Sequence, residues 1–411
     1  MRPNLLYLVH RIPYPPNRGD RIRSYHLLKF LAERANVSLA CLADETPEPG
    51  AIEVLKSLCR RVCVQPLGKS RWIRGIQSLA CGRSATEGLF YSPHLYATVR
   101  SWCREAKFDR VVAFCSGTAP YLRIPELAGV PLVMDMVDVD SEKFRDYSRT
   151  ARGLKKYLYA LEARRLRTLE TQLGQRAQVV TFVSDAEAEI YRRFAGSARV
   201  QAVGNGVDLD YFRPDPESEA KNGPVCVFVG ALDYAVNIDG IQWFCQNVWP
   251  RITAQQPDAV LWLVGRRPVR AVQQMESIPG VRVAGDVPDV RPYYRRAAVS
   301  VSPLRHARGV QNKVLESFAM GKAVVASPQS LEGLSAQDGV HGLPAETPDD
   351  WVNTITDLFH HLDRRRRLGQ AARRLVETEY VWDATLAPFS KYFDCGEQRE
   401  ANIESLLTSN T

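Results

Sequence analysis

Stretches typical of β-strands alternate with stretches typical of helices along almost the whole chain, and this alternation restricts the fold more than any other feature. Such a pattern predicts parallel sheets covered by helices. The strands expected in the first half are residues 4–10, 37–42, 61–65, 110–115, 131–137 and 179–183. A second set is expected at 225–229, 259–264, 281–284, 299–301, 323–326 and 339–343. Because 411 residues are too many for one ordinary core, we predict an α/β protein with two doubly wound domains.

A polar, turn-rich segment separates the two sets of strands. Asn205-Gly206 indicates a tight turn, and Pro214 and Pro216 suit an extended linker. Ligands of such sheets bind beyond the carboxyl ends of the strands, so two domains that face each other across a central cleft would suit two substrates. The predicted divisions are a first domain at 1–204, a linker at 205–224, a second domain at 225–380 and a C-terminal helix with a polar tail at 381–411. Helices expected at 350–361, 364–379 and 381–393 would close the second domain.

The segment from Pro303 to Ser327 combines a strand end, a basic loop, a short helix and a second buried strand. A cation-rich loop that leads into a helix N-terminus favours anions, because the helix dipole and the free N–H groups point at the bound phosphate. Glu316 lies one turn into this helix, within reach of sugar or ribose hydroxyls. Phosphate and polyol recognition side by side suggest a nucleotide-sugar, and the candidate ligands are Arg305, Arg308, Gln311, Asn312, Lys313 and Glu316.

Two other expected strands of the second half end in residues suited to the same ligand. Gly230 follows the strand at 225–229 and would let a ligand approach the backbone closely. Arg266 follows the strand at 259–264, and a guanidinium binds phosphate through its planar fork. The alternative for Arg266 is an ordinary solvated side chain.

The first half has its own strand-end motifs. A proline-rich loop connects His10 to Gly19, which opens a helix with Asp20 available as its cap. The loop lacks the Gly-x-Gly-x-x-Gly series, so it is no dinucleotide fingerprint; it either shapes a ligand site or is merely stiff. Asp135, Asp138 and Asp140 follow a later strand; such a cluster provides a general base, a metal ligand or a helix cap. We take Asp138 as the candidate base.

The net charge of +8 is concentrated in one helix. Residues 145–176 contain nine Lys or Arg and three Asp or Glu, with leucines at helical spacing. This pattern is either a solvated surface face or a patch that contacts an anionic membrane surface. Nucleic acid is not expected as a partner, because aromatic residues for base stacking are not interleaved with the charges.

Several classes of protein are disfavoured by composition. No stretch approaches the ~20 apolar residues of a membrane span, and residues 5–9 are too short for a signal peptide, so we expect a cytoplasmic protein. The nine cysteines are odd in number and form no Cys-x-x-Cys pair, which favours reduced core residues. The seven histidines have no metal-ligand spacing, so no metal site is predicted.

In their order along the chain, these motifs resemble those of retaining glycosyltransferases of family 4, which have the GT-B fold of two Rossmann-like domains. The resemblance runs from the Gly19 loop to residues 380–382 and is most specific at 181–187, 205–214 and 303–327. Residues 134–141 and 307–313 resemble one subgroup, the bacterial sugar transferases found with exopolysaccharide clusters of the PEP-CTERM/exosortase system.

The resemblance implies a hexosyltransferase-type enzyme that moves a sugar from a nucleoside-diphosphate-sugar to an acceptor hydroxyl with retention of configuration. The nucleotide-sugar is a co-substrate, and no cofactor or metal is expected. The acceptor would be a glycan or a lipid-linked saccharide in exopolysaccharide or other cell-surface glycan synthesis, with the protein peripheral at the inner face of the plasma membrane. Asp138, Lys313 and Glu316 are the candidate catalytic residues, and Gly19 would shape the loop between the substrates.

The chain departs from the family pattern at several positions. The family has two glutamates separated by seven residues; Glu316 matches the second, which holds the ribose, whereas Arg308 occupies the first and cannot accept the same hydrogen bonds. The Arg and Lys that follow the first glycine of the second domain fall on Ala231 and Asn237, and the catalytic-loop His falls on or near Ser116. Two alternatives stay open: an epimerase or hydrolase of GT-B fold, or a non-catalytic nucleotide-sugar-binding partner.

Overall fold

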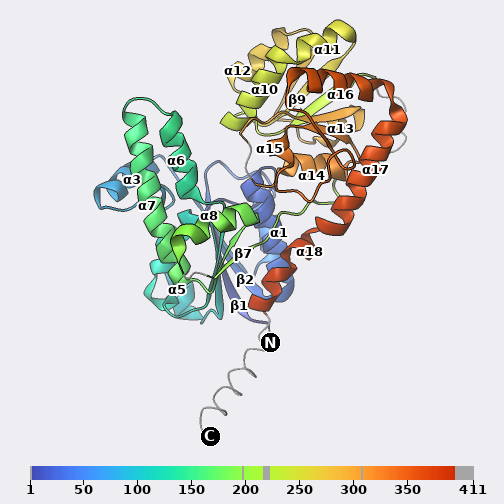
Figure 1. The fold of residues 1–411 in the computed structure, drawn as a ribbon. Helices are drawn as coiled ribbons and strands as arrows, with labels where there is room; N and C mark the ends of the chain where they lie inside the picture. Colours follow the sequence, from blue (N-terminus) through green and yellow to red (C-terminus); the bar gives the residue numbers. More distant parts are fainter. Residues whose placement is uncertain (1, 197–198, 216–222, 307–308, 394–411) are drawn as a thin grey trace. The chain divides into compact units, whose positions relative to one another are not determined.

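The computed structural model describes residues 2–196, 199–215, 223–306 and 309–393. It divides between Val203 and Gly204 into two compact units, which are coloured along the sequence in Figure 1. Unit 1 contains the residues up to 203 and those from 386 onward, and unit 2 contains Gly204–Thr385. Arg308 and residues 216–222 of the expected linker lie outside the described residues.

Unit 1 is built on one parallel sheet of seven strands, with the order β3-β2-β1-β4-β5-β6-β7. The strands are β1 (Asn4–Val9), β2 (Asn36–Ala43), β3 (Arg61–Pro66), β4 (Arg110–Phe114), β5 (Leu132–Val137), β6 (Val179–Phe182) and β7 (Val200–Ala202). The α-helices are α1 (Gly19–Arg34), α2 (Ala51–Leu58), α3 (Arg71–Ala80), α4 (Ala85–Leu89), α5 (Pro93–Glu105), α6 (Asp140–Thr150), α7 (Leu154–Arg176) and α8 (Asp185–Ala195). Two 3₁₀ segments, η1 (Ser116–Arg123) and η2 (Pro125–Leu127), follow β4.

Unit 2 repeats this architecture with a parallel sheet of six strands, in the order β10-β9-β8-β11-β12-β13. The strands are β8 (Val225–Val229), β9 (Val260–Gly265), β10 (Val281–Gly285), β11 (Val299–Ser302), β12 (Ala323–Ala326) and β13 (Leu343–Pro344). The helices are α10 (Ala235–Asn247), α11 (Trp249–Gln255), α12 (Arg270–Gln273), η3 (Gln274–Ser277), α13 (Arg291–Arg296), α14 (Asn312–Ala319), α15 (Pro328–Leu331), α16 (Pro348–His360) and α17 (Leu362–Glu379). The last helices of the chain are α18 (Trp382–Leu386) and η4 (Ala387–Tyr392).

The strands consist almost entirely of buried aliphatic and aromatic residues, as in β1 (Leu-Leu-Tyr-Leu-Val) and β8 (Val-Cys-Val-Phe-Val). Continuous apolar strands are typical of parallel sheets with helices on both faces. In each unit the first strand is central: β1 pairs with β2 and β4, and β8 pairs with β9 and β11. The strand order therefore reverses beside β1 and beside β8, and ligands of such sheets bind at the carboxyl ends there. The predicted fold class, with two doubly wound α/β domains, is confirmed.

Several details differ from the prediction. Strand β7 was not predicted, because three residues with a central glutamine give no hydrophobic pattern. The strand expected at 339–343 is reduced to Leu343–Pro344, since the Gly339 N–H donates to the Gly342 carbonyl 2.8 Å away in a turn. The helix expected at 381–393 is divided at Pro388 into α18 and η4. Residues 386–393 do not close the second domain but group with unit 1, where the Tyr392 hydroxyl donates to Gln201 Oε1 at 3.2 Å.

The leucine pattern of the basic helix also requires correction. Leu169 and Leu173 are buried, as a helix packed on the sheet requires, but Leu154, Leu158 and Leu161 are exposed. Helix α7 meets the core only from Glu162 onward, so its first two turns extend beyond it. Within the described ranges, no helix is both long enough and apolar enough to span a membrane.

Candidate functional site

Most of the predicted donor-binding residues of unit 2 follow the carboxyl ends of adjacent strands. Gly230 follows β8, Arg266 follows β9, Arg305 follows β11, and helix α14 begins at Asn312. This edge is the topological switch point of the unit 2 sheet, because β8 lies between β9 and β11. The anion-site prediction thus corresponds to a position at which ligands of doubly wound domains bind.

Two glycines bring the ends of β8 and β9 into close contact. Gly265 has a φ of +158°, and a Cβ there would lie 1.7 Å from the carbonyl oxygen of Gly230. The Gly230 N–H donates to the Val264 carbonyl at 2.9 Å. A Cβ at Gly230 would meet only side-chain atoms within 3.2 Å, those of Asn237, Lys313 and Phe228. Only glycine fits at position 265. At Gly230, the side that a Cβ would occupy faces the Lys313 side chain.

Lys313 is the cation of this strand-end site. Its Nζ donates to Asn237 Oδ1 at 3.1 Å and to Gln311 Oε1 at 3.3 Å, and lies 5.7 Å from the centre of the Phe228 ring. Burial lowers the pKa of Lys313 to about 8, although Glu316 opposes this shift. A partly desolvated ammonium that lacks a full counter-charge is suited to a bound diphosphate.

Glu316 lies one turn further along α14 and is partly buried. The hydroxyl of Tyr294, a fully buried residue of α13, donates to Glu316 Oε2 at 3.3 Å. Burial raises the pKa of Glu316 to about 7, while Tyr294 and Lys313 act to lower it. The other carboxylate oxygen is available for the hydroxyls of a ribose or a sugar.

The N-terminus of α14 carries the remaining predicted polar groups. Gln311 is the N-cap residue but provides no side-chain cap, so the first turn of α14 keeps its dipole without a side-chain oxygen on its N–H groups. Asn312 accepts a hydrogen bond from Asn205 Nδ2 at 3.0 Å, which ties the segment after Val203 to this helix. The Asn205–Asn312 hydrogen bond and the Lys313–Gln311 hydrogen bond thus hold the start of α14 and the residue that precedes it.

The predicted arginines are placed less uniformly. The exposed Arg305 lies 3.6 Å from Asp239 on α10. Arg266 is partly buried at the end of β9, where its carbonyl accepts from the Leu232 N–H at 2.9 Å. Arg308 lies outside the described residues. A hollow of about 250 Å³ in unit 2 lies at the C-terminal end of α14, beside Gly321 and Arg373, and contains none of the predicted donor ligands.

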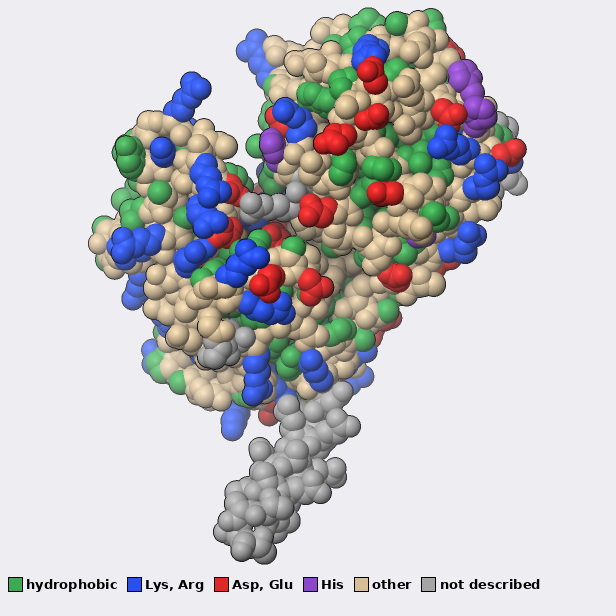
Figure 2. All heavy atoms as spheres, viewed as in Figure 1, with side chains coloured by type: hydrophobic (Ala, Val, Ile, Leu, Met, Phe, Trp, Pro, Cys, Tyr) green, Lys and Arg blue, Asp and Glu red, His purple; other side chains and the backbone are tan. Residues whose placement is uncertain are grey.

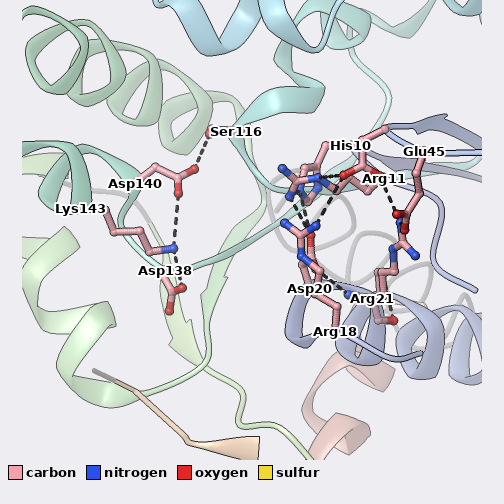
Figure 3. A network of polar contacts seen from close by, with 12 residues as sticks. His10, Arg11, Arg18, Asp20, Arg21, Glu45, Ser116, Asp138, Asp140 and Lys143 are labelled. Carbon is pink, nitrogen blue, oxygen red and sulfur yellow. Dashed lines mark hydrogen bonds and ion pairs between the residues drawn. The ribbon is translucent and has the colours of Figure 1, made fainter. Parts of the chain in front are cut away.

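In unit 1, Asp138 is bound in a chain of polar contacts at the ends of β4 and β5 (Figure 3). Lys143 Nζ lies 2.6 Å from Asp138 Oδ2 and 3.6 Å from Asp140 Oδ1, and Ser116 Oγ donates to Asp140 Oδ2 at 2.6 Å. Burial opposes the charge on Lys143, but the two aspartates more than offset it and raise the pKa of Lys143 well above its usual value. Asp138 is therefore an ion-paired carboxylate, held by the Lys143 ammonium.

The backbone is strained where these residues begin. Val137 has a φ of +70°, a conformation that β-branched residues rarely adopt, and the Asp138 N–H donates to the Met136 carbonyl at 2.9 Å in a γ-turn. Cys115, at the end of the neighbouring β4, has a φ of +64°. Strained positions at two adjacent strand ends fit a site at which the backbone aims side chains into a ligand.

Sequence reasoning missed the network beside the Gly19 loop. Arg11 Nη1 donates to Asp20 Oδ2 at 2.8 Å and to His10 Nε2 at 3.0 Å, while Arg18 Nε lies 3.1 Å from Asp20 Oδ1. Asp20 is thus not the cap of α1, whose N-cap residue is Arg18. Burial would raise the pKa of Asp20, but His10 first, and then Arg11 and Arg18, hold it well below its usual range. The signal that could have indicated this network is the presence of four arginines around the single Asp20 between residues 11 and 23.

The network fixes the loop that leads into α1. Arg21, fully buried, lies 3.1 Å from Asp44 Oδ1 and 2.6 Å from Glu45 Oε1 (Figure 3). Gly19 itself is exposed as the first residue of α1. Burial lowers the pKa of His10, despite its hydrogen bond with Asp20, so the ring is neutral at pH 7. His10 Nδ1 is buried and finds no hydrogen-bond partner among the described residues.

The described part of the chain contains no cluster suited to a metal ion: nowhere in it do three His, Cys, Asp or Glu side chains gather as metal ligands would. The eight described cysteines form no disulfide with one another, and burial raises the pKa of several, including Cys226 and Cys245. These thiols are core residues rather than nucleophiles.

Comparisons with known proteins agree with this division. Residues 19–206 match the family of glycosyl transferase 4-like domains, and residues 223–361 match the family of group 1 glycosyl transferases. The chain is 28% identical over 240 residues to the GDP-mannose-dependent alpha-(1-6)-phosphatidylinositol monomannoside mannosyltransferase of Mycolicibacterium smegmatis, covering 53% of this chain and 62% of that one. The Mycobacterium tuberculosis protein of the same name is 24% identical over 250 residues, covering 55% of this chain and 64% of its own. The match therefore spans less than two thirds of these relatives.

Solved structures share the whole fold. Sucrose-phosphate synthase from Thermosynechococcus elongatus superimposes with a TM-score of 0.72 at 17% identity, covering 96% of this chain and 98% of that one. Anabaena HepE, solved with UDP and glucose, gives a TM-score of 0.65 at 16% identity, covering 96% of this chain and all of its own. The chain therefore belongs to the family 4-like glycosyltransferases of GT-B fold, with a glycosyltransferase 4-like domain followed by a group 1 domain.

Proposed function

We propose that this protein transfers a sugar from a nucleoside-diphosphate-sugar to an acceptor hydroxyl with retention of anomeric configuration. The observation that carries this proposal is the Lys313–Glu316 pair on α14, at the carboxyl edge of the group 1 domain. One turn of helix presents an ammonium for phosphate and a carboxylate for hydroxyls. Gly265 lets the ends of β8 and β9 pack closely, and Gly230 lies against the Lys313 side chain.

The proposed chemistry follows from the charges. The bond between the sugar and the diphosphate breaks as the sugar acquires oxocarbenium character, and negative charge grows on the diphosphate. The dipole of α14 and Lys313 stabilise that charge, with Arg266, Arg305 and Arg308 as further cations. The acceptor oxygen bonds to the anomeric carbon on the face that the diphosphate leaves, and its proton passes to a diphosphate oxygen.

This route needs no obligatory base. Asp138 is proposed as an assisting carboxylate on the acceptor side, held in place by Lys143 at 2.6 Å. We further propose that cationic side chains take the role that a metal has in other transferases, so that transfer requires no cofactor. Candidates for the donor come from the mycobacterial relatives, which are named as GDP-mannose-dependent, and from HepE, which was solved with UDP-glucose.

The acceptor is proposed to be a glycan or a lipid-linked saccharide. The mycobacterial relatives are named for a phosphatidylinositol mannoside acceptor, which joins a sugar to a lipid. The resemblance of residues 134–141 and 307–313 to exopolysaccharide transferases supports a role in cell-surface glycan synthesis. The protein would then work in the cytoplasm, at the inner face of the membrane.

The rival functions make different demands. An epimerase or hydrolase needs a dedicated acid and base around the sugar, whereas Lys313 and Glu316 are both suited to the nucleotide. A non-catalytic binding partner is favoured by one observation: Arg308 occupies the position of the family's first glutamate. Such a protein would bind the donor and transfer nothing.

Thermal stabilisation by a panel of nucleoside diphosphates and nucleotide-sugars tests the donor site, in the wild type and in Glu316→Ala. Binding to the folded state raises the melting temperature, and at a fixed ligand concentration a tighter ligand raises it further. We expect one donor to stabilise the wild type selectively and the variant weakly. Product analysis with that donor and membrane extracts as acceptor then separates transfer from plain binding. A folded protein that no donor stabilises would overturn the proposal.

A further inference from the structure

Helix α3 directs its apolar side away from the protein. Trp72, Ile73 and Ile76 are 60%, 61% and 70% exposed and share one face of the helix. A surface helix of a globular protein normally packs this stripe on the core. In α3 it is Gly75 that is buried instead. The helix is thus attached to unit 1 by the side opposite to the one that sequence pattern would bury.

The attachment of α3 is close and rigid. A Cβ at Gly75 would lie 3.1 Å from the Leu89 side chain, and a Cβ at Gly88 would lie 2.1 Å from the Arg74 carbonyl oxygen. Helix α4 is in turn held by Glu162 of α7, which accepts from the N–H groups of Ala85 at 2.6 Å and Thr86 at 2.9 Å. The exposure of the α3 face is therefore fixed by packing between α3, α4 and α7.

Helix α7 continues this exposed surface. Leu154, Tyr157, Leu158 and Leu161 recur at helical spacing on its first two turns, and Leu154 and Tyr157 are 74% and 71% exposed. This row of side chains ends at Arg165. The Arg165 guanidinium lies 3.6 Å from the point that a Cβ on Gly82 would occupy. Gly82 comes two residues after the end of α3. We call these seven side chains the apolar surface: Trp72, Ile73, Ile76, Leu154, Tyr157, Leu158 and Leu161.

The charges of the segments that carry the apolar surface have one sign. Residues 67–83 contain four Lys or Arg and no acidic residue, and residues 151–161 contain three and none. Figure 2 shows blue side chains beside green ones on the part of unit 1 that contains α3, α6 and α7. A second copy of this surface would bring like charges together. An anionic bilayer supplies both the opposite charge and an apolar layer for the Trp and Ile side chains.

We propose that α3 and the first two turns of α7 dock this protein on an anionic lipid bilayer. Trp72, Ile73 and Ile76 enter the boundary between headgroups and acyl chains, while Lys155 and Lys156 contact the headgroups. The docking proposal goes beyond sugar transfer. It rests on the proposed function in one respect only: a transferase with a lipid-linked acceptor would meet that acceptor at the membrane. It also corrects the expectation that the basic residues of 145–176 alone form the patch.

Co-sedimentation of the full chain with vesicles tests the docking surface. The vesicles are phosphatidylcholine alone, or phosphatidylcholine mixed with phosphatidylglycerol. The wild type is expected to bind the mixed vesicles and to detach as salt is raised, because exposed charges are screened. The double variant Ile73→Ser/Ile76→Ser keeps every charge and should bind at least tenfold more weakly, since each isoleucine contributes about tenfold through buried apolar area.

Two further variants separate the parts of the surface. Lys155→Gln/Lys156→Gln should lose the preference for phosphatidylglycerol while keeping weak binding. Val340→Ser, which changes an exposed apolar residue of unit 2, should bind as the wild type does. All variants are checked for unchanged melting temperature and for unchanged stabilisation by the donor, so a failed donor site and a failed docking surface give different results.

The outcomes that overturn the proposal are specific. A folded wild type that stays in the supernatant with mixed vesicles would refute it. Equal binding by the isoleucine double variant would show that charge alone acts. Self-association without vesicles, lost in the isoleucine double variant, would instead assign the apolar surface to contact between two copies of this chain.

Discussion

The ammonium of Lys313 donates to the side-chain oxygen of Asn237 at 3.1 Å, across the gap between α14 and α10. In the family pattern a lysine stands where this chain has Asn237, which would place two cations together. Here an amide holds the remaining cation by its oxygen, while its Nδ2 donates to the Ala231 carbonyl at 2.8 Å. The site therefore depends on Lys313 more than a site with two such cations would.

Lys313→Ala is expected to lower kcat by about 10²–10³, because it removes a preorganised charge from the departing diphosphate. Its melting temperature should stay the same or rise, since the replaced ammonium is partly desolvated and has a lowered pKa. Arg305→Ala is the matched control: this side chain is exposed and faces Asp239, so the loss should be less than about tenfold. Steady-state kinetics of both variants, with the donor found by thermal stabilisation, measure the two losses in kcat. Full activity of Lys313→Ala would refute its phosphate role.

The affinity for a nucleotide-sugar should have its maximum between pH 7 and pH 8. Binding requires Glu316 ionised, with a pKa raised to about 7, and Lys313 protonated, with a pKa lowered to about 8. Because these two groups interact, the acidic and the alkaline limb of the pH profile belong to the pair and not to either residue alone. Glu316→Gln should remove the acidic limb and Lys313→Gln the alkaline one, as measured by titration calorimetry across pH. A flat profile for the wild type would contradict both assignments.

Glu316 should also make the free energy of unfolding depend on pH. Its folded pKa lies above the usual value, so the folded state binds more protons than the unfolded state between about pH 4.5 and pH 7. Its contribution to stability is complete below that window and is lost as the pH rises through it. Urea unfolding of the wild type and of Glu316→Gln at several pH values measures the difference. The variant should lose less stability across this window.

Gly265→Ala and Gly230→Ala are expected to behave differently. A Cβ at Gly265 would meet a backbone oxygen at 1.7 Å, so this variant should unfold or lose several kcal/mol of stability. A Cβ at Gly230 meets the ends of the Asn237 and Lys313 side chains, which can move. Gly230→Ala should therefore fold and bind the donor more weakly. Melting temperatures with and without donor distinguish the two.

Transfer should be insensitive to chelators if cationic side chains stabilise the diphosphate alone. The expected result is an unchanged rate after dialysis against EDTA and no gain on adding Mg²⁺ or Mn²⁺. Asp138→Asn is expected to leave donor affinity unchanged and to lower kcat by about tenfold or less, because the proposed route passes the acceptor proton to a diphosphate oxygen and needs no obligatory base. A rate abolished by EDTA and restored by one metal would contradict the metal-free proposal.

The fold class follows from the sequence alone. Alternating strands and helices imply parallel sheets, and residues that follow successive strands must meet at one edge, which is why Gly230 and Lys313 could be predicted to lie close together. The two-part division could also be read, because the Asn-Gly and proline-rich segment cannot continue a sheet. These features depend on local periodicity and turn chemistry, both of which a single sequence carries.

Tertiary structure alone decided the partners of these residues. That Lys313 contacts Asn237, that Gly265 lies against the Gly230 carbonyl, and that Asp138 pairs with Lys143 all depend on how separate elements pack. The inverted face of α3 is the sharpest case: its periodicity predicts a buried stripe, but packing of Gly75 against α4 exposes it. Periodicity determines which residues share a face, and only the packing of neighbouring elements determines which face is covered.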